Sequence, residues 1–178
     1  FNFRGKNTFL SFILMTQMFP SIMLLVPFYK ILSVYGLNNS LVGLCIVYVS
    51  FTIPFCSWMM VGYFRTIPTE IDESAAIDGA SHLQTFWKIA LPLVKPGLVS
   101  SAIYAFITCW NEYMFAAILL VNDKLKTAAV AIAEMNGYYK IAWNDMMAAS
   151  LVASVPLIIA FVFMQKSFIS GLTAGAVK

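Results

Sequence analysis

The chain has 178 residues, of which 61% are hydrophobic and 11% are charged, and its mean hydropathy is +0.82. A soluble domain of this length cannot bury so much apolar surface, so the composition excludes a soluble globular protein and indicates a membrane protein. The formal net charge is only +3, and no basic stripe with interleaved aromatics occurs, which excludes a nucleic-acid-binding protein.

Four apolar segments are long enough to cross a bilayer, which takes roughly 20 residues. They cover residues 9–28, 41–63, 97–121 and 146–165. The first contains Pro20 and Pro27 and the second contains Pro54, and each proline predicts a kink. Whether these kinks move during function or only pack helices stays open. Gln17, an amide deep in the first segment, either lines a solute pathway or bonds a neighbouring helix.

A polar stretch, residues 68–92, separates the second and third segments. Thr69 with Asp72, and Ser81 with Gln84, have the spacing of helix-capping boxes, so the stretch is predicted to form two short helices. Gly79 between them can adopt the left-handed conformation that ends a helix. We expect a rigid helical hairpin outside the bilayer, shaped to meet a partner.

The third segment carries a polar and aromatic cluster, Trp110-Asn111-Glu112-Tyr113. A carboxylate inside an apolar segment is costly and usually faces an interior or a water-filled cavity. Aromatic faces with amide and carboxylate acceptors also suit sugar rings and hydroxyls. These four residues, with Gln17, are therefore candidate pathway residues. The alternative is that Glu112 lies near the outer end of its helix and either snorkels to the membrane surface or bonds a partner subunit.

The loop between the last two segments, residues 122–145, combines charged residues with an apolar run, 127–133, that is too short to span. We expect a partly inserted or interfacial helix there, facing a binding protein. If the 68–92 stretch is cytoplasmic, seven of the 11 Lys and Arg residues lie inside and four lie outside. This distribution follows the positive-inside tendency and places both ends of the chain in the cytoplasm.

The sequence offers no enzyme chemistry. Cys45, Cys56 and Cys109 are isolated within apolar segments and His82 is the single histidine, so no metal site and no cofactor are predicted. No phosphate-binding loop occurs, so the chain does not hydrolyse a nucleotide itself. No hydrolase motif or cluster of acids and histidines suggests catalysis.

The pattern Glu73-Ser74-Ala75, then Gly79, then Ile89-Ala90-Leu91-Pro92, closely resembles the coupling loop of ATP-binding-cassette importer permeases. The resemblance continues to the C-terminal Gly171–Lys178, which is similar to the maltose-type sugar-importer branch. Ser74 replaces the usual alanine, and both residues are small. The resemblance implies an all-α polytopic membrane protein with the MetI-like transmembrane fold. It also implies contact with an ATPase subunit through the following residues: Glu73, Ser74, Ala75, Asp78 and Gly79.

Such a protein would be a bacterial inner-membrane permease that couples ATP hydrolysis by a separate ATPase dimer to sugar import. The resemblance further implies a second permease subunit, a solute-binding protein, surrounding lipid, and a tail, 169–178, that reaches the ATPase. Permeases of this branch usually carry six spans, and the chain lacks an initiator Met. We therefore expect a single permease domain, 1–178, that forms the C-terminal four-span portion. Import of glycerol phosphate, a polyol, an amino acid or a peptide is an alternative, as is a passive channel or scaffold.

Overall fold

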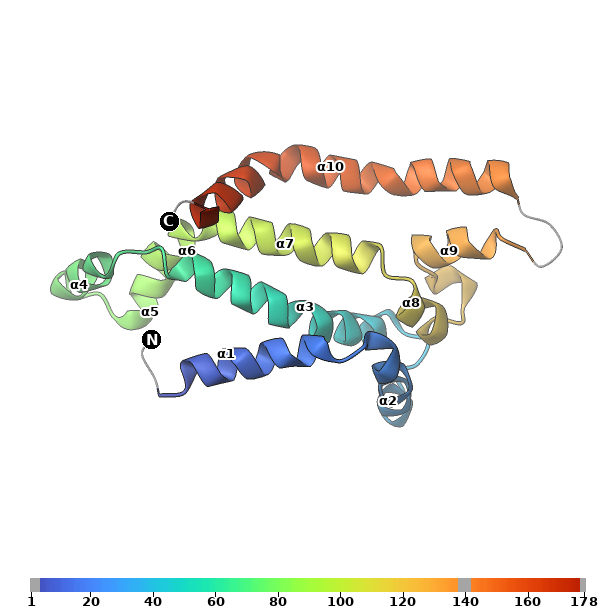
Figure 1. The fold of residues 1–178 in the computed structure, drawn as a ribbon, viewed down its shortest axis with the longest axis horizontal. Coiled ribbons are helices and arrows are strands. Elements are labelled where there is room, and N and C mark those ends of the chain that lie inside the picture. The colour runs from blue at the N-terminus through green and yellow to red at the C-terminus, as the bar shows by residue number, and fades with distance from the viewer. Residues whose placement is uncertain (1–3, 138–141, 177–178) are drawn as a thin grey trace. The chain divides into compact units, whose positions relative to one another are not determined.

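The computed structural model describes residues 4–137 and 142–176, with side chains described up to residue 163. Over these residues the structure is built from helices (Figure 1). Two compact units divide the chain. Unit 1 comprises residues 1–55 and 105–159, and unit 2 comprises residues 56–104 and 160–178. Three long helices, α3, α7 and α10, each contribute one part to each unit.

The first apolar segment is broken in the structure. Helix α1 (Lys6–Met15) continues into the 3-10 turn η1 (Thr16–Met18), and α2 (Ser21–Val34) then departs at 96°. The cause is Pro20, because the residue before a proline is pushed out of the helical region, and Phe19 is extended at φ −72° and ψ 126°. The predicted segment 9–28 is therefore not one continuous helix.

The second and fourth apolar segments form long helices. Helix α3 (Leu41–Phe64) begins at the predicted residue and ends one residue later. Helix α10 (Trp143–Ala176) begins before the predicted segment 146–165 and continues as helix through much of the predicted tail, of which residues 177 and 178 lie outside the described residues. By length and composition these two helices can each cross a membrane, and the described residues provide up to four spans if each bent helix pair is one span.

The third apolar segment also differs from its predicted extent, 97–121. Helix α7 (Lys95–Trp110) ends at the polar cluster, three residues are not helical, and α8 (Met114–Leu119) follows. The chain then forms the 3-10 turn η3 (Asp123–Leu125) and α9 (Ala128–Glu134). The short helix α9 falls on the apolar run 127–133, so a helix is found where one was expected.

The core of unit 1 lies where α2, α3, α8 and α9 meet. Val47, Phe115, Ala116, Leu120 and Val130 are at most 2% exposed. The rings of Phe28, Phe51 and Phe115 pack around one another with centroids 5.0 to 6.0 Å apart, two of the three pairs edge to face. This aromatic cluster fixes α2 and α8 against the first half of α3.

Unit 2 carries the polar stretch as α4 (Thr69–Ile77), α5 (His82–Thr85), the π-helical turn η2 (Phe86–Ala90) and α6 (Leu91–Leu93). Stacking of Phe64 on Phe86, with centroids 6.1 Å apart, fixes η2 to the end of α3. The start of α7 approaches α3 closely, since a Cβ added to Gly97 would overlap the Tyr63 ring. The Tyr63 hydroxyl also lies 3.3 Å from Ser100 Oγ, so the base of the hairpin is held on two sides.

Candidate functional site

The hairpin formed by α4 and α5 turns at Gly79, as the sequence predicts. Gly79 has φ +77°, in the left-handed region that favours glycine. The Ala80 amide donates to the Ala75 carbonyl at 2.9 Å, and the Gly79 amide donates to the Ala76 carbonyl at 3.1 Å. This pair of bonds is a Schellman motif, which satisfies carbonyls that the helix end leaves free. The turn is therefore closed by the backbone itself.

The two predicted capping boxes have different outcomes. The box of Ser81 and Gln84 is confirmed, because the Ser81 hydroxyl accepts from the Gln84 amide and the Gln84 side chain accepts from the Ser81 amide. The box of Thr69 and Asp72 is wrong. Pro68 occupies the N-cap, Thr69 is the first helical residue, and no side chain caps α4. Since proline pre-sets its own φ near the helical value, the helix starts directly after it.

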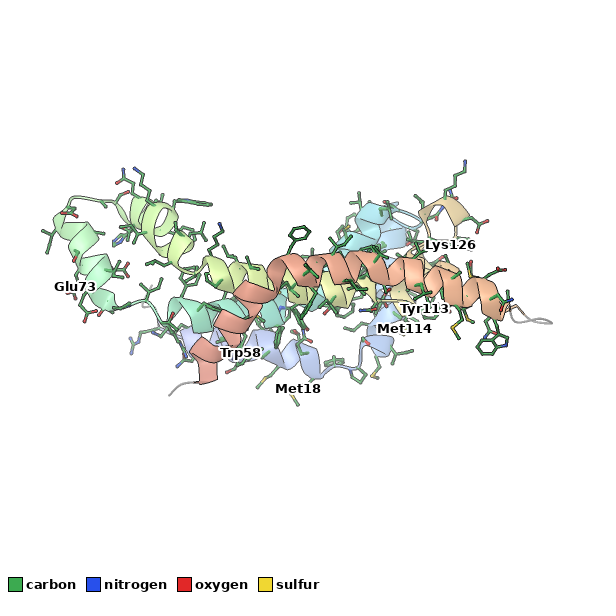
Figure 2. The ribbon with its side chains drawn as sticks, turned by 90° about the horizontal axis from the view of Figure 1, so that it is seen from above. Met18, Trp58, Glu73, Tyr113, Met114 and Lys126 are labelled. Atoms are coloured by element: carbon green, nitrogen blue, oxygen red, sulfur yellow. The ribbon has the colours of Figure 1, made fainter. Side chains whose placement is uncertain are left out.

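The coupling candidates of the hairpin lie on its surface, with one exception. Glu73, Ser74, Asp78 and Gly79 are exposed, and Figure 2 shows Glu73 on α4. Ala75 is 4% exposed and packs inside the hairpin, where a larger side chain would separate its helices. Ile77, Leu83 and Trp87 are 86%, 71% and 63% exposed. Large apolar side chains beside a carboxylate on a rigid hairpin form a surface suited to a protein partner.

The polar cluster after α7 is largely used by the protein itself. Glu112 accepts hydrogen bonds from the amides of Phe115 and Ala116, at 2.9 and 3.1 Å, and caps the start of α8. The Tyr48 hydroxyl of α3 donates to the same carboxylate at 3.0 Å. The carboxylate thus contacts α3 and α8 of its own chain, which neither sequence-based alternative for Glu112 anticipated.

The neighbours of Glu112 divide between protein contacts and the surface. Trp110 Nε1 donates to the Ala153 carbonyl of α10 at 3.1 Å, and Asn111 Nδ2 donates to the Ile107 carbonyl at 2.9 Å. Both residues border a small hollow of about 220 Å³ in unit 1. Tyr113 is 49% exposed and lies next to Met114 at the start of α8 (Figure 2). Through Trp110 and Glu112, the cluster mainly joins the end of α7 to α3, α8 and α10.

Gln17 lies beside the break between α1 and α2. Its Nε2 donates to the Phe51 carbonyl of α3 at 2.7 Å. Pro54 lacks the N–H that would bond the carbonyl four residues earlier, so this stretch of α3 is already loosened. Gln17 also borders a hollow of about 540 Å³, lined in addition by residues on both sides of the break. Gln17 thus bonds a neighbouring helix and lines a hollow at once.

Sequence reasoning missed two residues that organise unit 1. Tyr48 lies in the predicted apolar segment 41–63, where a phenol hydroxyl needs a hydrogen-bond partner. Asn39, at φ 53°, accepts from the amides of Val121 and Asn122 at 3.0 and 2.9 Å, and its own amide donates to the Leu119 carbonyl. The available signal was the Asn-Asn pair after Gly36, since asparagine tolerates left-handed turns.

The family model for the binding-protein-dependent transport system inner membrane component matches residues 1–173 of the chain. The chain belongs to this family. It is 39% identical over 177 residues to the trehalose/maltose transport system permease protein MalG of Thermococcus litoralis, covering 99% of this chain and 64% of that protein. It is 38% identical over 179 residues to the maltodextrin transport system permease protein MdxG of Bacillus subtilis, covering all of this chain and 64% of that protein.

One solved structure with a similar fold is the crystal structure of a bacterial ABC transporter involved in the import of the acidic polysaccharide alginate. The match has a TM-score of 0.76 and 26% sequence identity, and it covers 94% of this chain and 63% of the matched chain. The resemblance found in the coupling-loop motif is thereby confirmed, and so is the all-α, MetI-like membrane fold. The chain spans about two thirds of the length of these relatives.

Within the described part of this family member, no group of three or more His, Cys, Asp or Glu residues is placed to hold a metal ion. Cys45, Cys56 and Cys109 are not joined in disulfides, and the Cys56 thiol donates to the Ser101 carbonyl at 3.6 Å.

Proposed function

We propose that the chain is part of the membrane-spanning permease subunit of an ATP-driven importer for a sugar or oligosaccharide. The observation that carries this proposal is the hairpin of α4 and α5, which matches the family's coupling loop and is closed by the backbone at Gly79. The identity to permeases named for trehalose, maltose and maltodextrin supports a saccharide as the solute.

In this proposal the hairpin docks into a cleft of a separate ATPase subunit. Glu73 makes a charged contact there, while Ser74, Asp78 and Gly79 allow close approach at the exposed turn. Ala75, buried between the helices, keeps the hairpin compact. The exposed apolar side chains Ile77 and Leu83 supply apolar contact area. Closure of the ATPase dimer would then move the hairpin as one body and rock the attached helices.

The proposal requires several partners. An ATPase dimer supplies the energy, a second permease subunit completes the pathway, and a solute-binding protein delivers the sugar to the loop around α9. In this proposal the hairpin and both ends of the chain lie on the cytoplasmic side of a bacterial inner membrane, because that orientation puts most Lys and Arg residues inside. The apolar faces of α3 and α10 meet lipid or the partner permease.

The solute is proposed to be uncharged. Among the described residues that line the hollow beside Gln17, none has a charged side chain. An acidic polysaccharide, such as the one named for the alginate transporter, would need cationic partners to leave water. The sequence-based alternatives with charged solutes, glycerol phosphate among them, are disfavoured for the same reason.

The experiment is reconstitution of the full-length chain with its ATPase, second permease and binding protein in liposomes of phosphatidylethanolamine and phosphatidylglycerol. Uptake of radiolabelled maltose and trehalose is followed with ATP or a non-hydrolysable analogue. The expected result is uptake that needs ATP hydrolysis and every partner. ATP-independent uptake by this chain alone would contradict the proposal and favour a passive channel.

A matched pair of variants tests the docking surface. Glu73→Gln removes the charge proposed to contact the ATPase, whereas Glu70→Gln removes an exposed acid from the first turn of the same helix. We expect Glu73→Gln to weaken co-purification with the ATPase and Glu70→Gln to leave it nearly unchanged. Equal effects of the two substitutions would show that only the overall charge of α4 matters.

A further inference from the structure

The break between α1 and α2 lies against a hollow of about 540 Å³ within unit 1. The side chains that line it include four polar ones, Thr16, Gln17, Ser21 and Ser50, and the aromatic rings of Phe19, Phe28 and Phe51. Among the described lining residues none is charged. Within the described residues, neither Gln17 Oε1 nor Ser21 Oγ has a hydrogen-bond partner. The hollow therefore offers unused polar groups beside aromatic faces.

Helix α3 shows how deep this hollow lies. Gln17 contacts the carbonyl of Phe51, the eleventh of the 24 residues of α3. At 1.5 Å of rise per residue, Phe51 is ~15 Å from the N-terminal end of α3 and ~20 Å from its C-terminal end. Because the hydrocarbon core of a bilayer is ~30 Å thick, the hollow lies near the middle of the span that α3 makes.

Backbone groups at this depth need polar partners. Phe19 is extended, Pro20 has no N–H, and Pro20 as the N-cap of α2 has no side-chain oxygen to accept a bond. The first amides of α2, those of Ser21 and Ile22, have no acceptor within the helix. Broken backbone at membrane depth is tolerated where it is satisfied by protein or lines a water-filled cavity. An apolar cover, whether lipid or a partner's side chains, would leave these amides unpaired.

We propose that this hollow is a contact site for an uncharged polyhydroxylated solute on its way across the membrane. Gln17 Oε1 accepts from a hydroxyl of the solute, Ser21 Oγ both donates and accepts, and the Phe19 ring packs against the apolar C–H face of a sugar ring. The inference rests on the proposed function and places the solute at the break between α1 and α2. It does not use Glu112 or Trp110, whose polar groups already bond the protein.

The test uses cysteine accessibility in the complete transporter, assembled from full-length subunits in the same liposomes. Cys45, Cys56 and Cys109 are first replaced by alanine. Single cysteines are then introduced as Ser21→Cys and, on the α3 wall of the hollow, Ser50→Cys. Val26→Cys is the control, because Val26 is 59% exposed on the same helix as Ser21 but does not line the hollow. Each variant is reacted with a charged, water-soluble methanethiosulfonate.

The expected result is labelling of both reporter cysteines that is slowed by an uncharged saccharide from a panel of maltose, trehalose and maltotriose. At about ten times the Kd of the bound saccharide, labelling slows about tenfold, because only the free site reacts. Glycerol phosphate should not slow it, and no solute should slow labelling at Val26→Cys. Two reporters on different helices, α2 and α3, protect the test against one variant that fails to assemble.

Failure of this inference can be told from failure of the proposed function. If the cysteine-free complex imports sugar with ATP but the reporters are inert, or react equally fast with every saccharide, the solute passes elsewhere and the inference is overturned. Protection by glycerol phosphate alone would also overturn it. If the complex shows no ATP-dependent uptake while saccharides still slow the labelling, the contact site stands and the proposed coupling to ATP fails.

Discussion

The Tyr48 hydroxyl donates a 3.0 Å hydrogen bond to Oε2 of Glu112, 64 residues away along the chain. The same carboxylate accepts from the first free amides of α8 at Phe115 and Ala116. The Glu112 side chain thus joins α3 to the start of α8, at the point where α7 has ended. An ionisable group in an apolar segment here satisfies backbone amides that the break between α7 and α8 leaves without partners.

The first prediction concerns this capping interaction. Glu112→Ala removes the acceptor of two backbone amides and of the Tyr48 hydroxyl, and should cost about 1–3 kcal/mol of stability. Tyr48→Phe removes one bond and should cost about 1 kcal/mol. Because the two residues bond each other, the double variant should lose less than the sum of the single losses. Thermal unfolding of the detergent-solubilised protein measures these differences as shifts in apparent Tm.

Glu112→Gln serves as the control because it keeps one side-chain oxygen acceptor and removes the charge. Its Tm should fall between those of the parent and Glu112→Ala. If Glu112→Ala unfolds like the parent yet abolishes uptake, the carboxylate acts on the solute and the capping role is refuted.

The second prediction concerns Asn39, which joins the turn before α3 to the end of α8. Asn39→Ala loses the two hydrogen bonds from the Val121 and Asn122 amides. It also keeps a left-handed backbone conformation, which costs alanine about 1 kcal/mol. Asn39→Gly loses the same bonds without that strain. The apparent Tm should therefore fall in the order parent, glycine variant, alanine variant. An alanine variant at least as stable as the glycine variant would show that the backbone strain is unimportant.

The third prediction concerns pH and the loop around α9. The Lys126 ammonium lies 2.6 Å from Asp123 and 2.7 Å from Glu134. The hydrogen bond from Lys126, reinforced by its charge, holds the pKa of Asp123 below its ordinary value of 3.8. Hydrogen bonds to Asp123 and then Glu134 raise the pKa of Lys126 above its ordinary 10.5. Both shifts mean that the charged forms are favoured in the folded loop.

The sign of each shift fixes the pH window. The Asp123 contribution is fully present above pH 3.8 and is lost as pH falls through the lowered pKa. The Lys126 contribution is fully present below pH 10.5 and is lost as pH rises through the raised pKa. The Tm difference between the parent and Lys126→Met should be constant between these limits and shrink outside them. A difference that changes steadily across neutral pH would rule out this ion-pair cluster as its source.

Local signals in the sequence predict the turn of the hairpin and the start of α5, but not the start of α4 or the breaks between helices. Gly79 and the Ser81 and Gln84 pair act on neighbouring residues, so their conformations follow from short-range rules. The end of α7 depends on Glu112 meeting Tyr48, a contact across 64 residues that no periodicity reveals. Pro20 did signal a kink, but its size depends on Gln17 bonding α3 and on the ring cluster behind α2.

The candidate pathway shows the same limit in chemical terms. Trp110 and Glu112 are residue types that occur in sugar-binding sites. In the structure their polar groups bond the protein instead, and the spacing of the residues in the sequence does not reveal this. Gln17 is predicted from the same kind of evidence, and within the described residues its Oε1 has no hydrogen-bond partner. A polar residue in a span identifies a place where bonding is needed, whereas only the packed chain shows which partner supplies it.

The last prediction tests the hairpin turn with a graded series at Gly79. Among the described residues, no atom would lie within 4 Å of a Cβ at this position, so any loss is expected from the backbone conformation at φ +77° and not from a clash. Asparagine tolerates this region, alanine disfavours it by roughly 1 kcal/mol, and a β-branched valine disfavours it more. ATP-dependent uptake should fall in the order Gly79, Gly79→Asn, Gly79→Ala, Gly79→Val, while the amount of chain in the membrane stays constant. Co-purification with the ATPase should fall in the same order, because a strained turn misplaces Glu73 relative to α5. If Gly79→Val docks and transports like the parent, the left-handed closure of the hairpin is not what couples it to the ATPase.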